Sequence, residues 1–338
     1  MKNQKKITKR NTLKKIFIKI CRLLDFEIID QSSYDIPTSF KKISDNLSIP
    51  GIKSITLPLG EFKITRKIKS LKIIFKSCTS ELILDQNKKR LFNKEKNEYT
   101  FRSLNSLLGS VSQAKKIFKD INFDIVVTDT NSPRTDLIKM KSILSKYTIS
   151  NKLIEINLDD LKGIILDNVS DAKFATMANY YTSLNLVKNN TADLVYMVED
   201  DYIHTNDSIL EMLFSYEKLS SILKNEIFLL PADYPYLYTK SNNTKIFLGH
   251  KKHWRLVDES LGTFMTSKNL ILENFEKLIQ MSTKWADPFE KPLHDIYAKT
   301  PCFSPIPSLA IHCANVNSAY GLPPNLDWKN VWDANEDY

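Results

Sequence analysis

The chain has 338 residues, of which 42% are hydrophobic and 26% charged, a composition typical of a globular protein with one large domain or two average ones. It contains only 7 glycines, and no G-x-G occurs anywhere. P-loops, G-x-G-x-x-G dinucleotide loops and the G-x-S-x-G turn of α/β-hydrolases all need closely spaced glycines, so their standard forms are excluded.

The formal net charge of +9 is confined to the beginning of the chain. Residues 1–22 contain nine of the 48 Lys and Arg residues and no acid, so 39 basic residues remain to balance the 39 acidic ones. The rest of the chain is therefore neutral. A basic face for nucleic acid is not indicated, and we expect no nucleic-acid partner.

Residues 1–30 are predicted to contain a basic amphipathic helix that starts near Thr12. Its apolar positions follow helical spacing: Leu13, Ile16, Phe17, Ile20, Cys21 and Leu24. The uninterrupted apolar runs are three residues at most, too short for a signal peptide or a membrane span. The helix could lie on an anionic membrane surface or pack on the main domain, and both alternatives stay open.

Only 4 cysteines occur, without a C-x-x-C pair, which suits a reducing compartment and argues against a cysteine zinc site. We therefore expect a cytoplasmic protein, with a peripheral position on the inner membrane face if the basic helix binds lipid. Residues 31–70 are interpreted as a proline-containing connector with short strands at 52–59 and 62–64.

From residue 71 onward, strands alternate with helices. Strands are expected at 71–75, 123–129, 153–156 and 193–198, with helices at 101–118, 134–146 and 172–189. This alternation predicts an α/β fold, a doubly wound and mostly parallel sheet with helices on both faces. Further helices (209–223, 270–279) and strands (227–230, 245–248, 261–265) follow. The tail from Pro301 is expected to wrap the domain as an irregular segment, which gives one domain over 71–338.

Three expected strand ends carry polar residues, at 76–80, 128–132 and 198–202. Open parallel sheets bind ligands at such ends. The third reads Glu199-Asp200-Asp201, and three consecutive acids after a buried strand repel one another. A cation would neutralise them, and oxygen ligands favour Mg²⁺ or Mn²⁺. The alternative is an exposed acidic turn before the next helix.

The order of these elements, with Glu199-Asp-Asp201 at the position of a D-x-D motif, resembles the GT-A glycosyltransferases, particularly family 2. The resemblance covers roughly residues 70–315 and departs from the motif in its first acid. It implies a GT-A-like catalytic domain in which Asp201 binds the metal and Glu199 and Asp200 assist at the donor. It also implies nucleotide contacts from the first two strand ends: Ser77, Cys78, Thr79, Asp129 and Asn131.

The same resemblance implies a late histidine ligand and, in inverting members, a carboxylate base. His312, at the end of an apolar stretch, is the candidate metal ligand; a buried core histidine is the alternative. Asp295 is the preferred base and Asp287 the second candidate, with Glu290 or a retaining mechanism as further possibilities. A base there would take the proton of an acceptor hydroxyl.

These observations predict a metal-dependent glycosyltransferase, using Mn²⁺ or Mg²⁺, that moves a sugar from a nucleotide-diphosphate donor to a glycan or lipid-linked acceptor in cell-surface polysaccharide synthesis. Two alternatives remain. One is a sugar-phosphate nucleotidyltransferase, although such enzymes usually begin with a glycine-rich loop. The other is a non-catalytic module that binds nucleotide sugars or tethers an assembly to a membrane.

Overall fold

The computed structural model describes residues 12–26, 53–56, 60–80, 89–165, 168–239 and 244–338. The chain divides into two compact units, a smaller one of residues 1–44 and 55–61 and a larger one of residues 45–54 and 62–338. The larger unit includes the end of the expected connector, because Ile64 and Ile68 are buried.

The smaller unit contains helix α1 (Thr12–Leu23), which confirms the predicted N-terminal helix. The helix ends where Asp25 adopts a left-handed conformation with φ of 60°. The amides of Asp25 and Phe26 donate to the carbonyls of Arg22 and Cys21 at 3.3 and 2.9 Å. This arrangement is a Schellman cap, which satisfies carbonyls that the last helical turn leaves unpaired.

Two short strands, β1 (Lys53–Thr56) and β2 (Gly60–Lys63), pair with each other in a separate sheet. The expected strands of the connector are therefore present with shifted bounds. Among the described residues, no helix is both long enough and apolar enough to span a bilayer.

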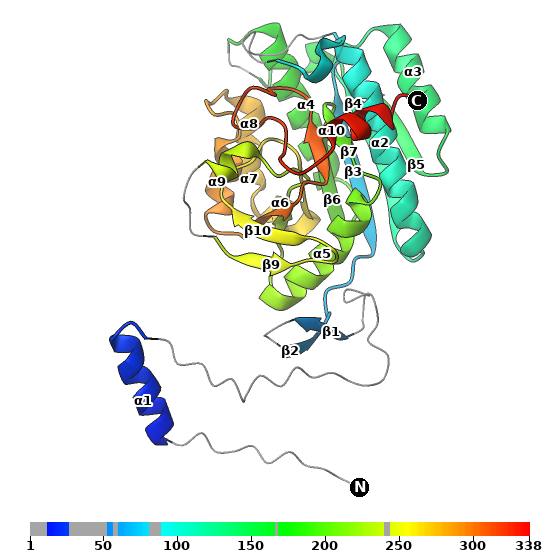
Figure 1. Cartoon of the computed structure of the whole chain (residues 1–338). Coiled ribbons are helices and arrows are strands. Elements are labelled where there is room, and N and C mark those ends of the chain that lie inside the picture. The colour runs from blue at the N-terminus through cyan, green and yellow to red at the C-terminus, as the bar shows by residue number, and fades with distance from the viewer. Residues whose placement is uncertain (1–11, 27–52, 57–59, 81–88, 166–167, 240–243) are drawn as a thin grey trace. The chain divides into compact units, whose positions relative to one another are not determined.

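A nine-stranded sheet forms the centre of the larger unit, in the order β5-β4-β3-β6-β11-β8-β12-β10-β9 (Figure 1). Its strands are β3 (Ser70–Ser77), β4 (Asn122–Asp129), β5 (Ser150–Glu155), β6 (Leu194–Glu199), β8 (Phe228–Leu229), β9 (Ile246–Leu248), β10 (His253–Val257), β11 (Phe264–Ser267) and β12 (Cys302–Ile306). The first four in this order are parallel, and β8 is parallel to β12. The β9, β10 and β11 strands pair antiparallel.

The central strands have the sequences expected of parallel strands that are covered on both faces. In β6, the residues from Leu194 to Val198 form a continuous apolar run and are fully buried. Such runs bury both sides of a strand, whereas alternating sequences bury one. The predicted α/β class is confirmed by this sheet, and the antiparallel strands make it mixed.

Helices cover both faces of the sheet (Figure 1). They are α2 (Lys96–Ile117), α3 (Arg134–Ser145), α4 (Asp171–Lys188), α5 (Ser208–Leu223), α6 (Lys268–Glu273), α7 (Phe275–Leu278), α8 (Gln280–Thr283), α9 (Lys291–Tyr297) and α10 (Trp328–Asp333). α2 packs with α3 and α5, whereas α4 packs with α6 and α8. Since crossovers are right-handed, the change of direction after β5 sends α4 to the opposite face from α2 and α3.

The C-terminal segment is more regular than predicted. The sequence suggested an irregular tail from Pro301, but β12 joins the central sheet and β13 (Ala310–His312) pairs antiparallel with β7 (Tyr202–His204). This second pair places His312 opposite Tyr202, directly after the acidic triplet. The prediction of an irregular tail is wrong because the pairing partners of β12 and β13 lie 45 to 110 residues away and cannot be recognised from local sequence.

Candidate active site

The direction of strand order reverses between β3 and β6. β4 and β5 follow β3 to one side, and the chain then returns to add β6 on the other side. Open α/β sheets bind ligands at the carboxyl ends of the strands beside such a reversal. Lys76 near the end of β3 and Glu199 at the end of β6 are register partners at this edge.

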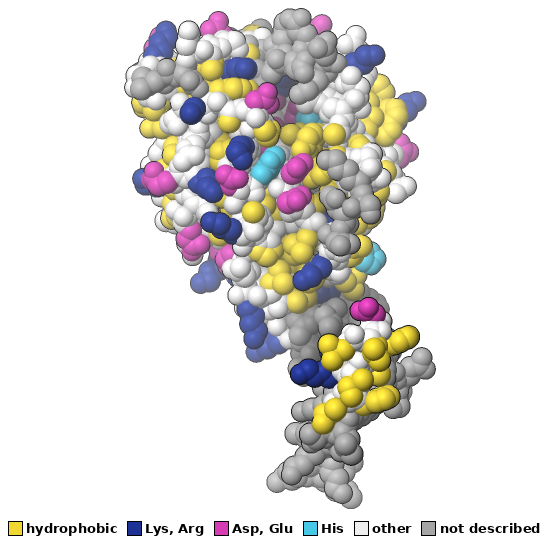
Figure 2. Space-filling view, turned by 90° about the vertical axis from the view of Figure 1, so that its left-hand side faces the viewer, with side chains coloured by type: hydrophobic (Ala, Val, Ile, Leu, Met, Phe, Trp, Pro, Cys, Tyr) yellow, Lys and Arg dark blue, Asp and Glu magenta, His cyan; other side chains and the backbone are white. Residues whose placement is uncertain are grey.

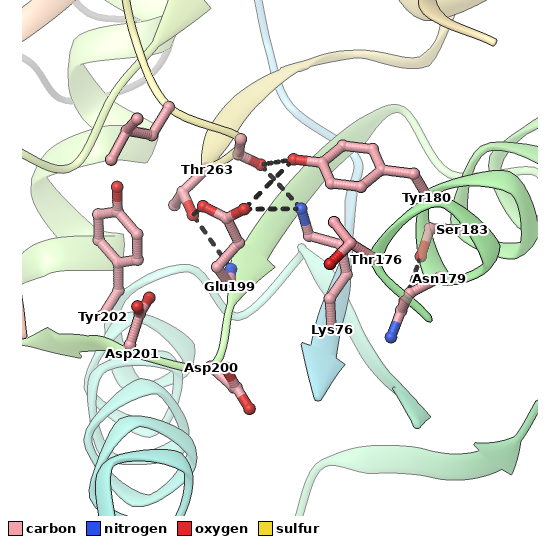
Figure 3. A network of polar contacts seen from close by, with 12 residues as sticks. Lys76, Thr176, Asn179, Tyr180, Ser183, Glu199, Asp200, Asp201, Tyr202 and Thr263 are labelled. Atoms are coloured by element: carbon pink, nitrogen blue, oxygen red, sulfur yellow. Dashed lines mark hydrogen bonds and ion pairs between the residues drawn. The ribbon is translucent and has the colours of Figure 1, made fainter. Parts of the chain in front are cut away.

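Three acidic side chains follow β6 and point in different directions (Figure 3). Each carboxylate has a separate basic partner, and the distance between the paired groups is 3.6 Å for Glu199 and 3.4 Å for Asp201. These partners are Lys76 on β3 for Glu199, Lys96 on α2 for Asp200 and His312 on β13 for Asp201. The repulsion suggested by the sequence is thus relieved by the protein itself, so it does not on its own require a metal ion.

Asp200 connects the turn after β3 to the first turn of α2. It forms an ion pair with Lys96 and accepts hydrogen bonds from Thr100 Oγ1 at 2.8 Å and from the Cys78 amide at 3.1 Å. The residue is buried. Hydrogen-bonding groups of the protein already contact both carboxylate oxygens of Asp200. A nucleotide that also bound Asp200 would have to share these oxygens with them.

Glu199 belongs to a buried network around Lys76 (Figure 3). The Lys76 ammonium lies 3.1 Å from the Gly262 carbonyl and 3.6 Å from the centre of the Tyr180 ring. Burial lowers the pKa of Lys76, and the charges of Glu199 and Glu290 oppose this effect. A lysine is thus kept buried beside the Glu199 carboxylate, the Gly262 carbonyl and the Tyr180 ring.

The loop before β11 completes this network. The Glu199 amide donates to Thr263 Oγ1 at 3.0 Å, and that hydroxyl lies 3.3 Å from Glu199 Oε2. A Cβ atom at Gly262 would lie 1.5 Å from Tyr180 Oη and 2.7 Å from Glu199 Oε1. Only glycine fits there, because the tyrosine and the carboxylate fill the space that any side chain would need.

Asp201 and His312 are brought together by the pairing of β7 with β13. His312 Nε2 lies 3.4 Å from Asp201 Oδ2, and Nδ1 lies 2.8 Å from the Tyr320 carbonyl. Burial lowers the pKa of His312, but the charge and hydrogen bond of Asp201, together with the Tyr320 carbonyl and the charge of Glu199, outweigh burial and raise the pKa. Burial raises the pKa of Asp201, but the charge and hydrogen bond of His312, together with the charges of Lys96 and Arg90, outweigh burial and bring the pKa to about 2.

The same two residues also fit a divalent cation. An Nδ1–H donated to the Tyr320 carbonyl leaves a lone pair on Nε2 that faces Asp201. Oδ1 of Asp201 is buried and has no hydrogen-bond partner among the described residues. Adjacent imidazole and carboxylate ligands suit Mn²⁺ well, whereas Mg²⁺ prefers oxygen. Within the described ranges, no three His, Cys, Asp or Glu side chains form a metal cluster.

Asp129 lies between the turns that follow β3 and β4. It accepts hydrogen bonds from Ser77 Oγ at 2.7 Å and from Ser132 Oγ at 2.6 Å. Burial raises the pKa of Asp129, and these hydrogen bonds oppose the shift. Thr79 adds a third link, because its hydroxyl donates to Asp136 at 2.7 Å and its amide to Ser132 Oγ at 2.8 Å. The predicted nucleotide-binding residues are therefore brought together, and their side chains brace the two turns.

Cys78 and Asn131 lie in the same two turns. The Cys78 side chain is half-buried, and burial raises the pKa of its thiol. Asn131 is exposed and has a left-handed backbone with φ of 63°. Asn tolerates this conformation better than most residues, so it suits the tight turn after β4.

The candidate bases lie in and before α9, in different environments. Asp295 is exposed and forms ion pairs with Lys291 at 3.4 Å and Lys277 at 3.8 Å. Asp287 is also exposed. The structure therefore places Asp295 on the exposed surface, in ion pairs with two lysines.

Glu290, the third acid, is next to the buried network. The preceding residue, Phe289, packs edge-on against the Tyr180 ring at 5.1 Å. The charge of Glu290 also acts on the pKa of both Lys76 and Tyr180. Of these acids, Glu290 is the one whose electrostatic influence reaches the carboxyl edge of β3.

Sequence reasoning missed Lys76, Lys96 and Tyr180. A signal for Lys76 was present, since it is a charged residue at the end of the apolar run Ile73–Phe75. A charged residue buried beside a strand end needs a partner nearby. Lys96 and Tyr180 lie on helices whose sequences give no such indication.

Comparisons with known proteins give similarity at the level of solved structures. No protein-family model matches the chain, and a search of curated proteins finds no match. It is similar to S. aureus TarS 1-349 (13% identity, TM-score 0.39), covering 70% of this chain and 57% of that one. It is also similar to the bifunctional glycosyltransferase WbbM (11% identity, TM-score 0.39), covering 68% of this chain and 37% of that one. The galactosyltransferase LgtC, in complex with donor and acceptor sugar analogues, is similar as well (13% identity, TM-score 0.33), covering 67% of this chain and 68% of that one. In another structure of S. aureus TarS, the match covers 35% of that chain.

Proposed function

We propose that this chain is a glycosyltransferase that moves a sugar from a nucleotide-diphosphate donor to a hydroxyl acceptor. The observation that supports this most is the Asp201–His312 pair directly after β6, next to the pair of Lys76 and Glu199 at the carboxyl edge of β3 and β6, beside the reversal of the sheet. Nucleotides bind at such reversals in open α/β sheets. The chain has no glycine-rich phosphate loop, so the phosphates need charged side chains or a cation instead.

In this proposal Asp201 and His312 would hold Mn²⁺ or Mg²⁺. When bound, the cation would supply positive charge to the diphosphate leaving group. Lys76 keeps Glu199 and Tyr180 in place, and its buried positive charge favours an anionic ligand at the same edge. Asp129 and Asp200 keep the turns around the donor fixed, which limits the reorganisation needed on binding.

We propose Glu290 as the acid that accepts the acceptor proton, in preference to Asp295. A general base must reach the reacting hydroxyl. Asp295 is exposed between two lysines, whereas the charge of Glu290 acts on the network around Lys76. The acceptor is proposed to be a glycan or a lipid-linked sugar of cell-surface polysaccharide synthesis, used at the cytoplasmic face of a membrane.

The test is thermal unfolding of the full chain with a panel of nucleotide-diphosphate sugars, each with and without Mn²⁺. A donor at 100 times its Kd stabilises the protein by about 2.7 kcal/mol. We expect one nucleotide class to raise Tm in a Mn²⁺-dependent way and Asp201→Asn to abolish the metal-dependent part. The control is Asp159→Asn, an exposed acid paired only with Lys162 in the described contacts. If no nucleotide sugar shifts Tm under either condition, the proposed function is refuted.

A further inference from the structure

The described part of the smaller unit presents a concentrated apolar surface. Of the thirteen exposed large hydrophobic side chains among the described residues, six lie between positions 16 and 26. They are Ile16, Phe17, Ile20, Leu23, Leu24 and Phe26, which are 50 to 78% exposed. Figure 2 shows them gathered on α1 and its end. Single exposed apolar residues are ordinary, but a contiguous group on one helix indicates a surface that a membrane or another molecule covers.

Basic residues occupy the other side of the same helix. At about 100° per residue, Lys19 and Arg22 project away from the stripe that contains Ile16 and Ile20. The chain up to residue 22 has nine basic residues and no acid, while all the remaining charges cancel. The whole excess positive charge of the protein is therefore next to its most exposed apolar helix.

The C-terminal cap of α1 extends this apolar surface by one residue. The Schellman hydrogen bond from the Phe26 amide to the Cys21 carbonyl folds the chain back at the end of the helix. In this motif the residue at the Phe26 position lies against the last turn, where a hydrophobic contact is usual. Phe26 remains 69% exposed, so the cap presents an aromatic ring at the margin of the stripe.

We propose that α1 lies in the plane of an anionic lipid bilayer, with its apolar stripe in the acyl boundary and its lysines among the lipid headgroups. Twelve residues of helix are about 18 Å long, which is shorter than the roughly 30 Å needed to cross the hydrocarbon core. Apolar area and electrostatic attraction act together in such interfacial helices. Charge complementarity selects an anionic surface over a neutral one or an apolar protein groove.

The test is co-sedimentation of the full chain with vesicles of phosphatidylcholine alone or with 30% phosphatidylglycerol. We expect binding to the anionic vesicles that weakens as salt rises, because the attraction is screened. Lys15→Gln with Lys19→Gln should reduce the partition coefficient about thirtyfold, since each basic residue near the surface contributes about a factor of five. Phe17→Ser with Ile20→Ser should also reduce it at every salt concentration.

The matched control is Lys284→Gln with Lys299→Gln, two exposed lysines of the larger unit. It removes the same charge and should leave vesicle binding unchanged. Equal loss in both lysine pairs would show a general charge effect and overturn the assignment to α1. Equal binding to neutral and anionic vesicles, or binding to neither, would also overturn it. A dimer that forms with rising protein concentration in the absence of lipid would instead assign the apolar stripe to a second copy of the chain. No sugar donor enters this assay, so its outcome is independent of the proposed transfer activity.

Discussion

Gly262→Ala tests whether the network around Lys76 is as tightly packed as the structure indicates. The added Cβ would lie 1.5 Å from Tyr180 Oη, whereas ordinary contacts begin at about 3.4 Å. The tyrosine hydroxyl must therefore move by about 1.9 Å. That movement breaks its 3.1 Å hydrogen bond to the residue 262 carbonyl and shifts the ring on which Lys76 rests.

The expected cost is about 3 kcal/mol of unfolding free energy. Overpacking typically costs about 1–3 kcal/mol, and a lost hydrogen bond adds about 1 kcal/mol. Gly163→Ala is the matched control, because a Cβ atom there meets nothing within 4 Å. Its effect should stay within about 0.5 kcal/mol.

Urea unfolding measures the change in stability, and Tm shifts induced by the sugar donor measure donor binding at the site. Adding Tyr180→Phe to Gly262→Ala removes the clashing hydroxyl and should recover part of the stability. Recovery should be incomplete, because the Tyr180 Cζ position is still 2.8 Å from the new Cβ. If Gly262→Ala is as stable as Gly163→Ala and keeps its donor response, the packing argument fails.

The remaining predictions concern the two ends of the sheet. Glu290→Gln should slow transfer by roughly 10²- to 10⁴-fold in steady-state assays, with Asp295→Asn near wild type; the reverse order would restore Asp295 as the base. His312→Gln should weaken Mn²⁺-dependent donor stabilisation and leave any metal-free donor shift in place, as measured by thermal unfolding. Burial raises the pKa of Glu217 from 4.5 to about 7, so its stability contribution is full below pH 4.5 and is lost as pH rises through 7. This amounts to about 3 kcal/mol, and Glu217→Gln should flatten the pH profile in urea unfolding between about pH 4 and 7.5; an unchanged profile would contradict the shift.

Local sequence predicted the first half of the fold well, because each of its elements is decided by nearby residues. The apolar runs of β4 and β6 and the helical spacing of α2, α3 and α4 are all visible within short windows. The short strands β7, β10, β12 and β13 were not predicted. The partners of β7, β12 and β13 lie far along the chain, as with Tyr202 and His312, and β10 pairs with distant β12 as well as with neighbouring β9, so the conformation of these strands depends on tertiary pairing.

The sequence predicted which kinds of residue form the candidate site, but only part of their arrangement in space. Asp201 and His312 were chosen separately, and the structure places them 3.4 Å apart. The acidic triplet was interpreted as a single cation site, but β6 ends at Glu199 and the chain turns at Asp200 and Asp201, so the three acids have different environments. Asp295 was chosen by its position in the chain, and position alone did not reveal the lysines on either side of it.

The scarcity of glycine has a structural counterpart at this edge of the sheet. Phosphate-binding loops usually rely on glycines that allow tight turns and expose backbone amides. Here the turns after β3 and β4 are cross-linked by carboxylates that accept backbone and hydroxyl donors, through Asp129, Asp136 and Asp200. These amides are already used within the protein, so an anionic donor has to be met by side-chain charge. Under the proposed function, Lys76 would supply part of this charge, whereas Gly262 makes room for the Tyr180 side chain.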